Sequence, residues 1–265
     1  MLKKIGISLG VIIVVPLIFI LMQSIASGGI LIIYIKAHHL NVQKVGKEAL
    51  TQIVENRAYY GAAIGDFIAI LVLMLIYLIP KEGLIKRCRF KKFDAKKIPE
   101  IILFIVGFSI LSIVFIKFTQ GDIKSYLSVE KYMAASASTV LGGILLVLII
   151  PIFEEIIFRG AIFGTLRKQM PWIVALIIQA IIFSLMHGNL IQSIYTFPLG
   201  IILGLIFVYT GSMFGDILGH MIFNLFGLYL IPVLAFFFYN WIIYLAIGII
   251  LIVIACIYHK KVVIN

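Results

Sequence analysis

Apolar segments long enough to cross a membrane recur along the whole chain, and this pattern limits the possible folds more than any other feature. A hydrocarbon core about 30 Å thick is crossed by a helix of roughly 20 residues, and a backbone in lipid is satisfied only in helices and closed barrels. Of the 265 residues, 63% are hydrophobic and 12% are charged, unlike an ordinary soluble domain. We therefore expect an all-α polytopic membrane protein with about eight transmembrane helices, at Ile5–Ile35, Gly61–Ile79, Ile101–Phe118, Thr139–Phe163, Trp172–Met186, Tyr195–Thr210, Asp216–Ile231 and Phe236–Tyr258.

Basic residues between the apolar segments predict the topology. The segment 81–99 carries eight Lys and Arg residues against two acids, so the positive-inside rule places it in the cytoplasm. With eight helices in the plasma membrane, both termini are then cytoplasmic and the charge-balanced segment 119–138 is outside. The basic segment 36–60 would also be outside, against the rule. The basic residues behind the net charge of +11 lie between apolar segments that contact a lipid bilayer. They do not form one soluble basic face, so we expect no nucleic-acid partner.

The absence of a soluble linker predicts a single membrane-embedded domain. Its parts are N-terminal helices in 1–138, a core in 139–240 and a last helix with a cytoplasmic tail in 241–265. The first apolar run resembles a signal peptide but has no clear cleavage site, so we expect a retained anchor helix. Cys88 and Cys256 have neither metal-binding nor disulfide spacing.

Three charged residues lie inside the fourth apolar segment, in the stretch PIFEEIIFRG. Such residues are costly in a bilayer and are read as functional by default. Glu155 and Arg159 are four residues apart, within about 40° on a helix, and can pair. Glu154 points about 100° away, so it is left free to act as a general base. The alternative is that all three charges only hold neighbouring helices together.

Two further segments place polar side chains four residues apart. The stretch FSLMH puts Phe183 beneath His187, and HMIFN puts His220 and Asn224 on one face of a helix. Taken singly, each pair is as well explained by interfacial histidines or by hydrogen bonds between helices. The combination with the glutamates favours a catalytic cluster.

The motifs EExxxR, FxxxH and HxxxN, in this order and each in an apolar segment, resemble the CPBP family of intramembrane proteases, the CAAX prenyl endopeptidase type II and Abi bacteriocin-processing group. The resemblance covers about residues 139–239. It implies a peptide hydrolase acting on a membrane-associated substrate, either a CAAX-type prenylated or a bacteriocin-like peptide. Glu154 and His187 would activate water, His220 and Asn224 would hold the oxyanion, and Glu155, Arg159 and Phe183 would support them.

The cofactor is left open by the residues. Glu154, His187 and His220 supply the ligand types of a catalytic zinc site. Asn224 argues for a metal-free mechanism, because an amide is a poor zinc ligand but a good donor to an oxyanion. We favour the metal-free form. Straight helices would hold these residues at different depths, so we expect breaks near Gly188 and Gly215.

Other functions fit less well. The chain has no HExxH motif, and Asp66 and Asp216 follow glycines without completing GxGD. Asp66, near the end of its segment, is expected to be hydrated, and a Ser212 nucleophile with His220 would be poorly spaced. A transporter would show repeated halves. The serious alternative is a non-proteolytic membrane protein for bacteriocin self-immunity or for binding a partner.

Overall fold

The structure, a computed structural model, describes the chain except residues 1, 80–81, 120–132, 134–136, 231–239 and 265. Within the described residues every regular element is helical. Among the described residues seven helices are long and apolar enough to cross a membrane, one fewer than predicted, because the apolar helix α10 has only 14 residues. The all-α polytopic fold is therefore confirmed. The elements are α1 (Leu2–Ala37), α2 (Lys47–Glu55), α3 (Ala58–Ile76), α4 (Leu84–Cys88), η1 (Ala95–Lys97), α5 (Ile98–Thr119), α7 (Val140–Ile144), η2 (Leu145–Ile149), α8 (Ile150–Glu155), η3 (Ile156–Phe163), α9 (Gly164–Leu166), α10 (Trp172–Leu185), α11 (Leu190–Thr210), α12 (Met213–Leu225), η4 (Phe226–Leu230) and α14 (Trp241–Ile264).

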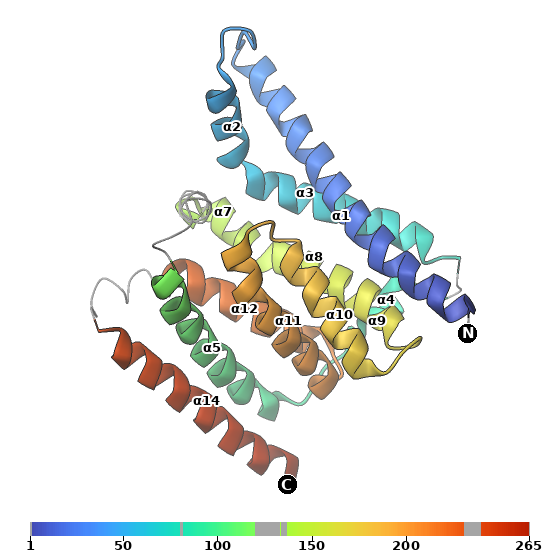
Figure 1. The fold of residues 1–265 in the computed structure, drawn as a ribbon, viewed down its shortest axis with the longest axis vertical. Coiled ribbons are helices and arrows are strands. Elements are labelled where there is room, and N and C mark those ends of the chain that lie inside the picture. The colour runs from blue at the N-terminus through green and yellow to red at the C-terminus, as the bar shows by residue number, and fades with distance from the viewer. Residues whose placement is uncertain (1, 80–81, 120–132, 134–136, 231–239, 265) are drawn as a thin grey trace.

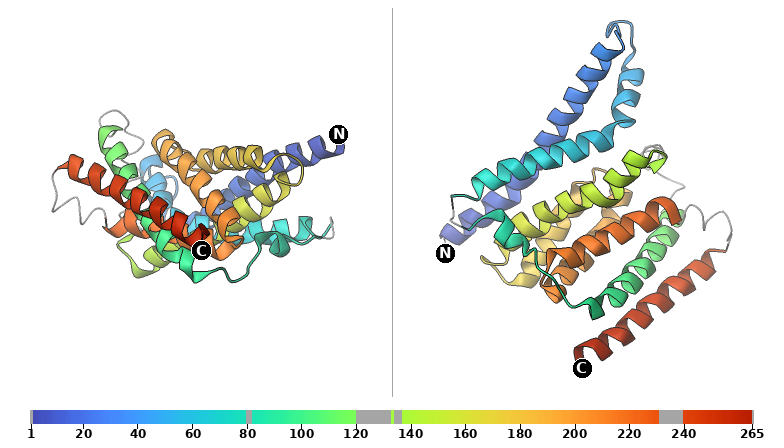
Figure 2. Two further views of the ribbon diagram at one scale, coloured as in Figure 1. Left: turned by 90° about the horizontal axis from the view of Figure 1, so that it is seen from below. Right: turned by 180° about the vertical axis from the view of Figure 1, so that it is seen from behind.

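The helices run side by side in alternating directions, with α8 and α12 between the outer pairs α1/α3 and α5/α14 (Figures 1 and 2). The start of α1 and the end of α14 lie at the same end of the helices (Figure 1). At 36 residues α1 is roughly 54 Å long, well beyond the hydrocarbon core. Its distal part projects with α2 from the opposite end (Figure 1). The predicted outer segment 119–138 and the start of the last helix at Phe236 fall largely outside the described residues.

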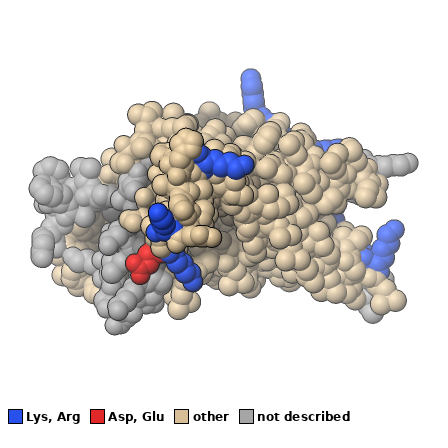
Figure 3. All heavy atoms as spheres, turned by 90° about the horizontal axis from the view of Figure 1, so that it is seen from above, with Lys and Arg blue, Asp and Glu red and all other residues tan. Residues whose placement is uncertain are grey.

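Apolar side chains cover the outside as well as the inside. Phe158, Phe163, Phe183 and Phe207 are sealed in the core, with at most 1% of their surface exposed. Large aliphatic side chains on α1, α10 and α14 are nevertheless exposed. The face in Figure 3 shows only scattered charges on an uncharged surface. Lipid chains are the environment in which such an exterior costs little.

The fourth transmembrane segment alternates between α and π geometry, with π turns at η2 and η3 on either side of α8. Pro151 lies in the first turn of α8 and has no backbone N–H. In the wider π spacing, the carbonyl of Leu146 would pair with residue 151, so that carbonyl is left without a backbone donor. The segment therefore offers a free acceptor and a changed register just before Glu154.

Two glycines with positive φ reverse the chain around α11. Gly188, at φ 66°, follows α10, and Gly211, at φ 64°, ends α11. The prediction of a break at Gly188 is confirmed, whereas the predicted break at Gly215 is wrong. Gly215 lies inside the first turn of α12, where a β-carbon would come 2.6 Å from the side chain of Thr210. Glycine is needed at this position because the side chain of Thr210 packs against it, and not because of its backbone conformation.

The N-terminal helices are joined by a buried polar contact. Gly65 lets α3 approach α1 so closely that a β-carbon there would lie 2.4 Å from the Cα of Gln23. Beside it, Gln23 Nε2 donates to Asp66 Oδ1 over 2.8 Å, and Asp66 is fully buried. The expectation of a hydrated Asp66 is therefore wrong. A residue near the end of an apolar segment is still buried when a neighbouring helix covers it, as α1 covers Asp66.

The basic segment 81–99 folds against the core at the end where both chain termini lie. Arg87 donates to Thr165 over 3.0 Å and pairs with Glu82 at 3.3 Å, and only 8% of its surface is exposed. Cys88 is fully buried beside it, and this burial raises the pKa of the Cys88 thiol to about 12. A thiol in this state is unreactive, which agrees with the absence of cysteine chemistry predicted from spacing.

Candidate active site

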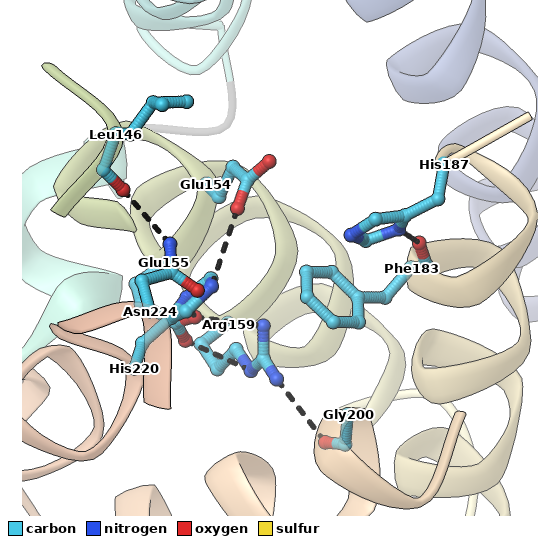
Figure 4. Close-up of polar contacts among 9 residues, drawn as sticks. All are labelled: Leu146, Glu154, Glu155, Arg159, Phe183, His187, Gly200, His220 and Asn224. Carbon is cyan, nitrogen blue, oxygen red and sulfur yellow. Dashed lines mark hydrogen bonds and ion pairs between the residues drawn. The ribbon is translucent and has the colours of Figure 1, made fainter. Parts of the chain in front are cut away.

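Four helices bring the residues of the three motifs together. Glu154, Glu155 and Arg159 come from α8 and η3, His220 and Asn224 from α12, and Phe183 and His187 from α10 and the turn after it. Figure 4 shows these side chains around one space at the centre of the bundle. The difference in depth expected of straight helices is removed by the π turns on either side of α8 and by the reversals at Gly188 and Gly211.

Glu155 and Arg159 form the predicted ion pair. Arg159 Nε lies 2.9 Å from Glu155 Oε2, Arg159 Nη1 donates to Oε1 over 3.0 Å, and both side chains are fully buried. Arg159 Nη2 also donates to the carbonyl of Gly200 over 3.2 Å, which ties α11 to the pair (Figure 4). This buried ion pair, made of one hydrogen bond and a second close contact between charges, keeps Glu155 ionised.

His220 lies between the two glutamates. Its Nδ1 is 2.7 Å from Glu155 Oε1, and its Nε2 is 3.5 Å from Glu154 Oε2. Because Glu155 is held ionised by Arg159, Nδ1 carries the hydrogen of that short contact. Nε2 is thereby directed toward Glu154. The two neighbouring acids thus have different partners, as the helical spacing predicted.

Glu154 and His187 are the partly exposed members of the cluster. The side chain of Glu154 is 15% exposed, whereas those of Glu155 and His220 are 0% and 3% exposed. His187 is half-buried, and its Nδ1 lies 2.9 Å from the carbonyl of Phe183, so its Nε2 is free to face the space. Figure 4 shows the carboxyl group and the imidazole facing the same space above the Phe183 ring.

Phe183 supports three members of the cluster. Its ring packs edge-on against His187 and His220, with centroids 5.0 and 5.9 Å apart, and the guanidinium carbon of Arg159 lies 4.7 Å from its centroid. Phe158 closes the other side at 5.1 Å. The ring therefore fixes the separation of the two imidazoles.

Asn224 is partly engaged by the backbone. Its Nδ2 donates over 2.9 Å to the carbonyl of Leu146, the acceptor left free before Pro151. An amide nitrogen has two hydrogens, so one N–H is still available to a ligand. The contact with Leu146 fixes the orientation of that second N–H.

The zinc ligand set was tested against this geometry. Among the described residues, no group of three His, Cys, Asp or Glu side chains is arranged to hold a metal ion. Glu154 and His220 are close, but His187 stands across the Phe183 ring. As placed, the three side chains do not fit a common metal ion.

Three buried polar residues near the cluster were not among the predicted site residues. Asp216 and Gln179 are fully buried, the carboxyl oxygens of Asp216 meet no donor, and the amide of Gln179 has no hydrogen-bond partner; Asp66 is within electrostatic range of Glu154. The GD pairs did mark both aspartates, but only as an incomplete motif of another protease class. Ser212, in contrast, caps α12 and hydrogen-bonds to the carbonyl of Lys91, so it does not face His220.

Comparison with known proteins agrees with the motifs. Residues 136–226 match the model of the type II CAAX prenyl endopeptidase Rce1-like family. The chain is also similar to a protein of Bacillus subtilis (strain 168) named "Putative membrane peptidase YdiL", with 29% identity over 171 residues, which are 61% of this chain and 67% of that protein. No solved structure matches the chain significantly. The family resemblance predicted from the three motifs is thereby confirmed.

Proposed function

We propose that this chain, whose residues 136–226 match the type II CAAX prenyl endopeptidase Rce1-like family, hydrolyses a peptide bond with Glu154 as general base. The proposal is supported by the different environments of the two neighbouring acids, Glu154 and Glu155. Glu155 is sealed in a pair with Arg159, while Glu154 is partly exposed and faces His187. A partly exposed carboxylate that is not held in an ion pair with Arg159 is the group that can accept a proton from water.

The mechanism follows from the four polar side chains. A water held between Glu154 and His187 gives a proton to Glu154 as its oxygen attacks the scissile carbonyl carbon. The second N–H of Asn224 and Nε2–H of a doubly protonated His220 then donate to the oxyanion. Glu155 stabilises that form of His220 by accepting from Nδ1. Collapse of the intermediate breaks the C–N bond, and Glu154 returns its proton to the leaving amine.

The substrate we propose is a peptide held at the membrane. An apolar cavity of about 340 Å³ lies between α1 and α10, and one of its lining residues is Met186, next to His187. A hydrophobic side chain or lipid attached to the substrate would fit such a cavity beside the reacting bond. The lining residues are Ile12, Pro16, Ile178, Ile181, Ile182, Leu185 and Met186.

We further propose that the protein lies in the plasma membrane with both termini in the cytoplasm and acts without a metal. The basic segments at the end of the helices that holds both termini support the orientation. The second N–H of Asn224 supports the metal-free form, since it serves an oxyanion better than a metal.

The test is cleavage by the purified full chain in detergent, with a library of lipid-tethered fluorogenic peptides. Glu154→Gln and His187→Ala should lose cleavage, and Glu48→Gln, an exposed acid on α2, should keep it. Chelator should have no effect, and loss restored by zinc would overturn the metal-free form. Cleavage by Glu154→Gln would remove the proposed base. A chain that cuts nothing but protects cells from a bacteriocin, equally with either variant, would be an immunity protein.

A further inference from the structure

Asp216 is a buried acid with no ordinary partner. It lies in the first turn of α12, has no exposed surface, and neither of its carboxyl oxygens meets a hydrogen-bond donor. An unpaired charged carboxylate in such a place would cost several kcal/mol.

The group that Asp216 meets is Glu155. The two side chains are within hydrogen-bond reach of each other, and both are acids. Two carboxylates can only accept, so a hydrogen bond between them needs a proton on one of them. Glu155 Oε1 already accepts from Arg159 Nη1 and from His220 Nδ1, and Glu155 Oε2 lies 2.9 Å from Arg159 Nε in the ion pair that keeps Glu155 charged. The proton therefore belongs on Asp216, which donates it to Glu155.

Asp216 and His220 are four residues apart on α12 and so share one face of the helix. Both reach Glu155 from that face, one helical turn apart. Glu155 is thus held at two points by α12 and at two by Arg159. Loss of one point would let the carboxylate rotate and release the ring of His220.

We propose that Asp216 is a positioning residue, which as a neutral acid donates a hydrogen bond to Glu155 and thereby fixes the orientation of His220 in the reaction. This inference rests on the proposed function and extends it. Asp216 has no exposed surface. Its effect reaches the oxyanion only through Glu155 and His220.

The experiment compares two substitutions at this position. Asp216→Asn keeps the shape and places an N–H where the acid proton lies, so kcat should stay within about threefold of the natural chain. Asp216→Ala removes the donor, so kcat should fall by about tenfold or more with KM within about twofold, as expected when transition-state alignment is lost. Ser109→Ala, a buried hydroxyl on α5 away from the site, is the control.

Thermal unfolding in detergent gives a second measurement that needs no substrate. Asp216→Asn should keep the Tm of the natural chain, and Asp216→Ala should lower it by several degrees. If Asn is as damaging as Ala in both measurements, Asp216 is a charged partner of Arg159 and the proposal is wrong. If Ala is harmless while Glu154→Gln is inactive, only this inference fails. If Glu154→Gln stays active, the proposed function itself fails.

Discussion

The Nδ1 atom of His220 lies 2.7 Å from Glu155 Oε1, although the two residues are 65 positions apart in the chain. This contact decides which way the imidazole faces, because the remaining nitrogen must then point toward Glu154 at 3.5 Å. A single ring thereby connects the acid that is buried and paired with the acid that is free to react. The stability of this arrangement depends on what holds Glu155.

Removal of Arg159 should damage both folding and cleavage. Arg159→Met leaves Glu155 as a buried charge with only His220 as a charged partner, and we expect a loss of about 3 kcal/mol in stability. Adding Glu155→Gln should restore part of that loss, since the uncompensated charge is gone, but should not restore cleavage. Thermal unfolding of the single and double variants measures the difference. Arg57→Met, which loses a cation–π contact with Tyr34 and a hydrogen bond to the carbonyl of Ile53 but no ion pair with an acid, is the control, and equal Tm values for all variants would contradict the prediction.

Replacement of Phe183 should affect cleavage more than stability. Phe183→Leu keeps most of the buried apolar volume but loses the ring that touches His187 and His220, so we expect about tenfold lower kcat and about 1 kcal/mol lower stability. Phe207→Leu is the matched control, because Phe207 is equally buried but packs against Phe163. Similar activity of the two variants would show that the Phe183 ring has no part in orienting the histidines.

The parts of the site that depend on one helix were predictable from the sequence. The spacing of four residues was enough to pair Glu155 with Arg159 and to leave Glu154 apart, because only local helical geometry is involved. The same spacing brought Phe183 beneath His187. The apolar segments likewise predicted the helices, because lipid leaves the backbone no other choice.

The contacts between helices could not be predicted from the sequence. Whether Glu154 meets His220 depends on the register that the π turns around Pro151 set, and no residue pattern announces a π turn. Burial of Asp66 depends on α1, which carries no motif. The contact of Asp216 with Glu155 depends on the same packing, so its GD pair was read only as an incomplete motif.

A salt bridge outside the membrane segments should make stability depend on pH. The hydrogen bond from Lys168, with the nearby charges of Lys168 and Arg87, lowers the pKa of Glu82 below its ordinary 4.5. A carboxyl group with a lowered folded-state pKa stabilises the fold fully above its unfolded pKa, and the contribution is lost as the pH falls through the folded value. Glu82→Gln should therefore lower Tm more at pH 7 than near pH 3, because the stabilisation declines as the pH falls toward and through the folded-state pKa of Glu82. Glu48→Gln is the control, and a Tm difference for Glu82→Gln that is the same at both values would refute the assignment.

The contact between Gln23 and Asp66 should hold the N-terminal helices on the core. Gln23→Leu removes the donor 2.8 Å from a fully buried acid, whose second oxygen has no donor either. We expect a loss of about 1–2 kcal/mol, seen as a Tm lower by several degrees, whereas Gln52→Leu on the exposed face of α2 should change nothing. The double variant Gln23→Leu with Asp66→Leu should recover most of the loss, because replacing both partners leaves no polar group unsatisfied. If the double variant is less stable than Gln23→Leu alone, Asp66 is stabilised by something other than Gln23.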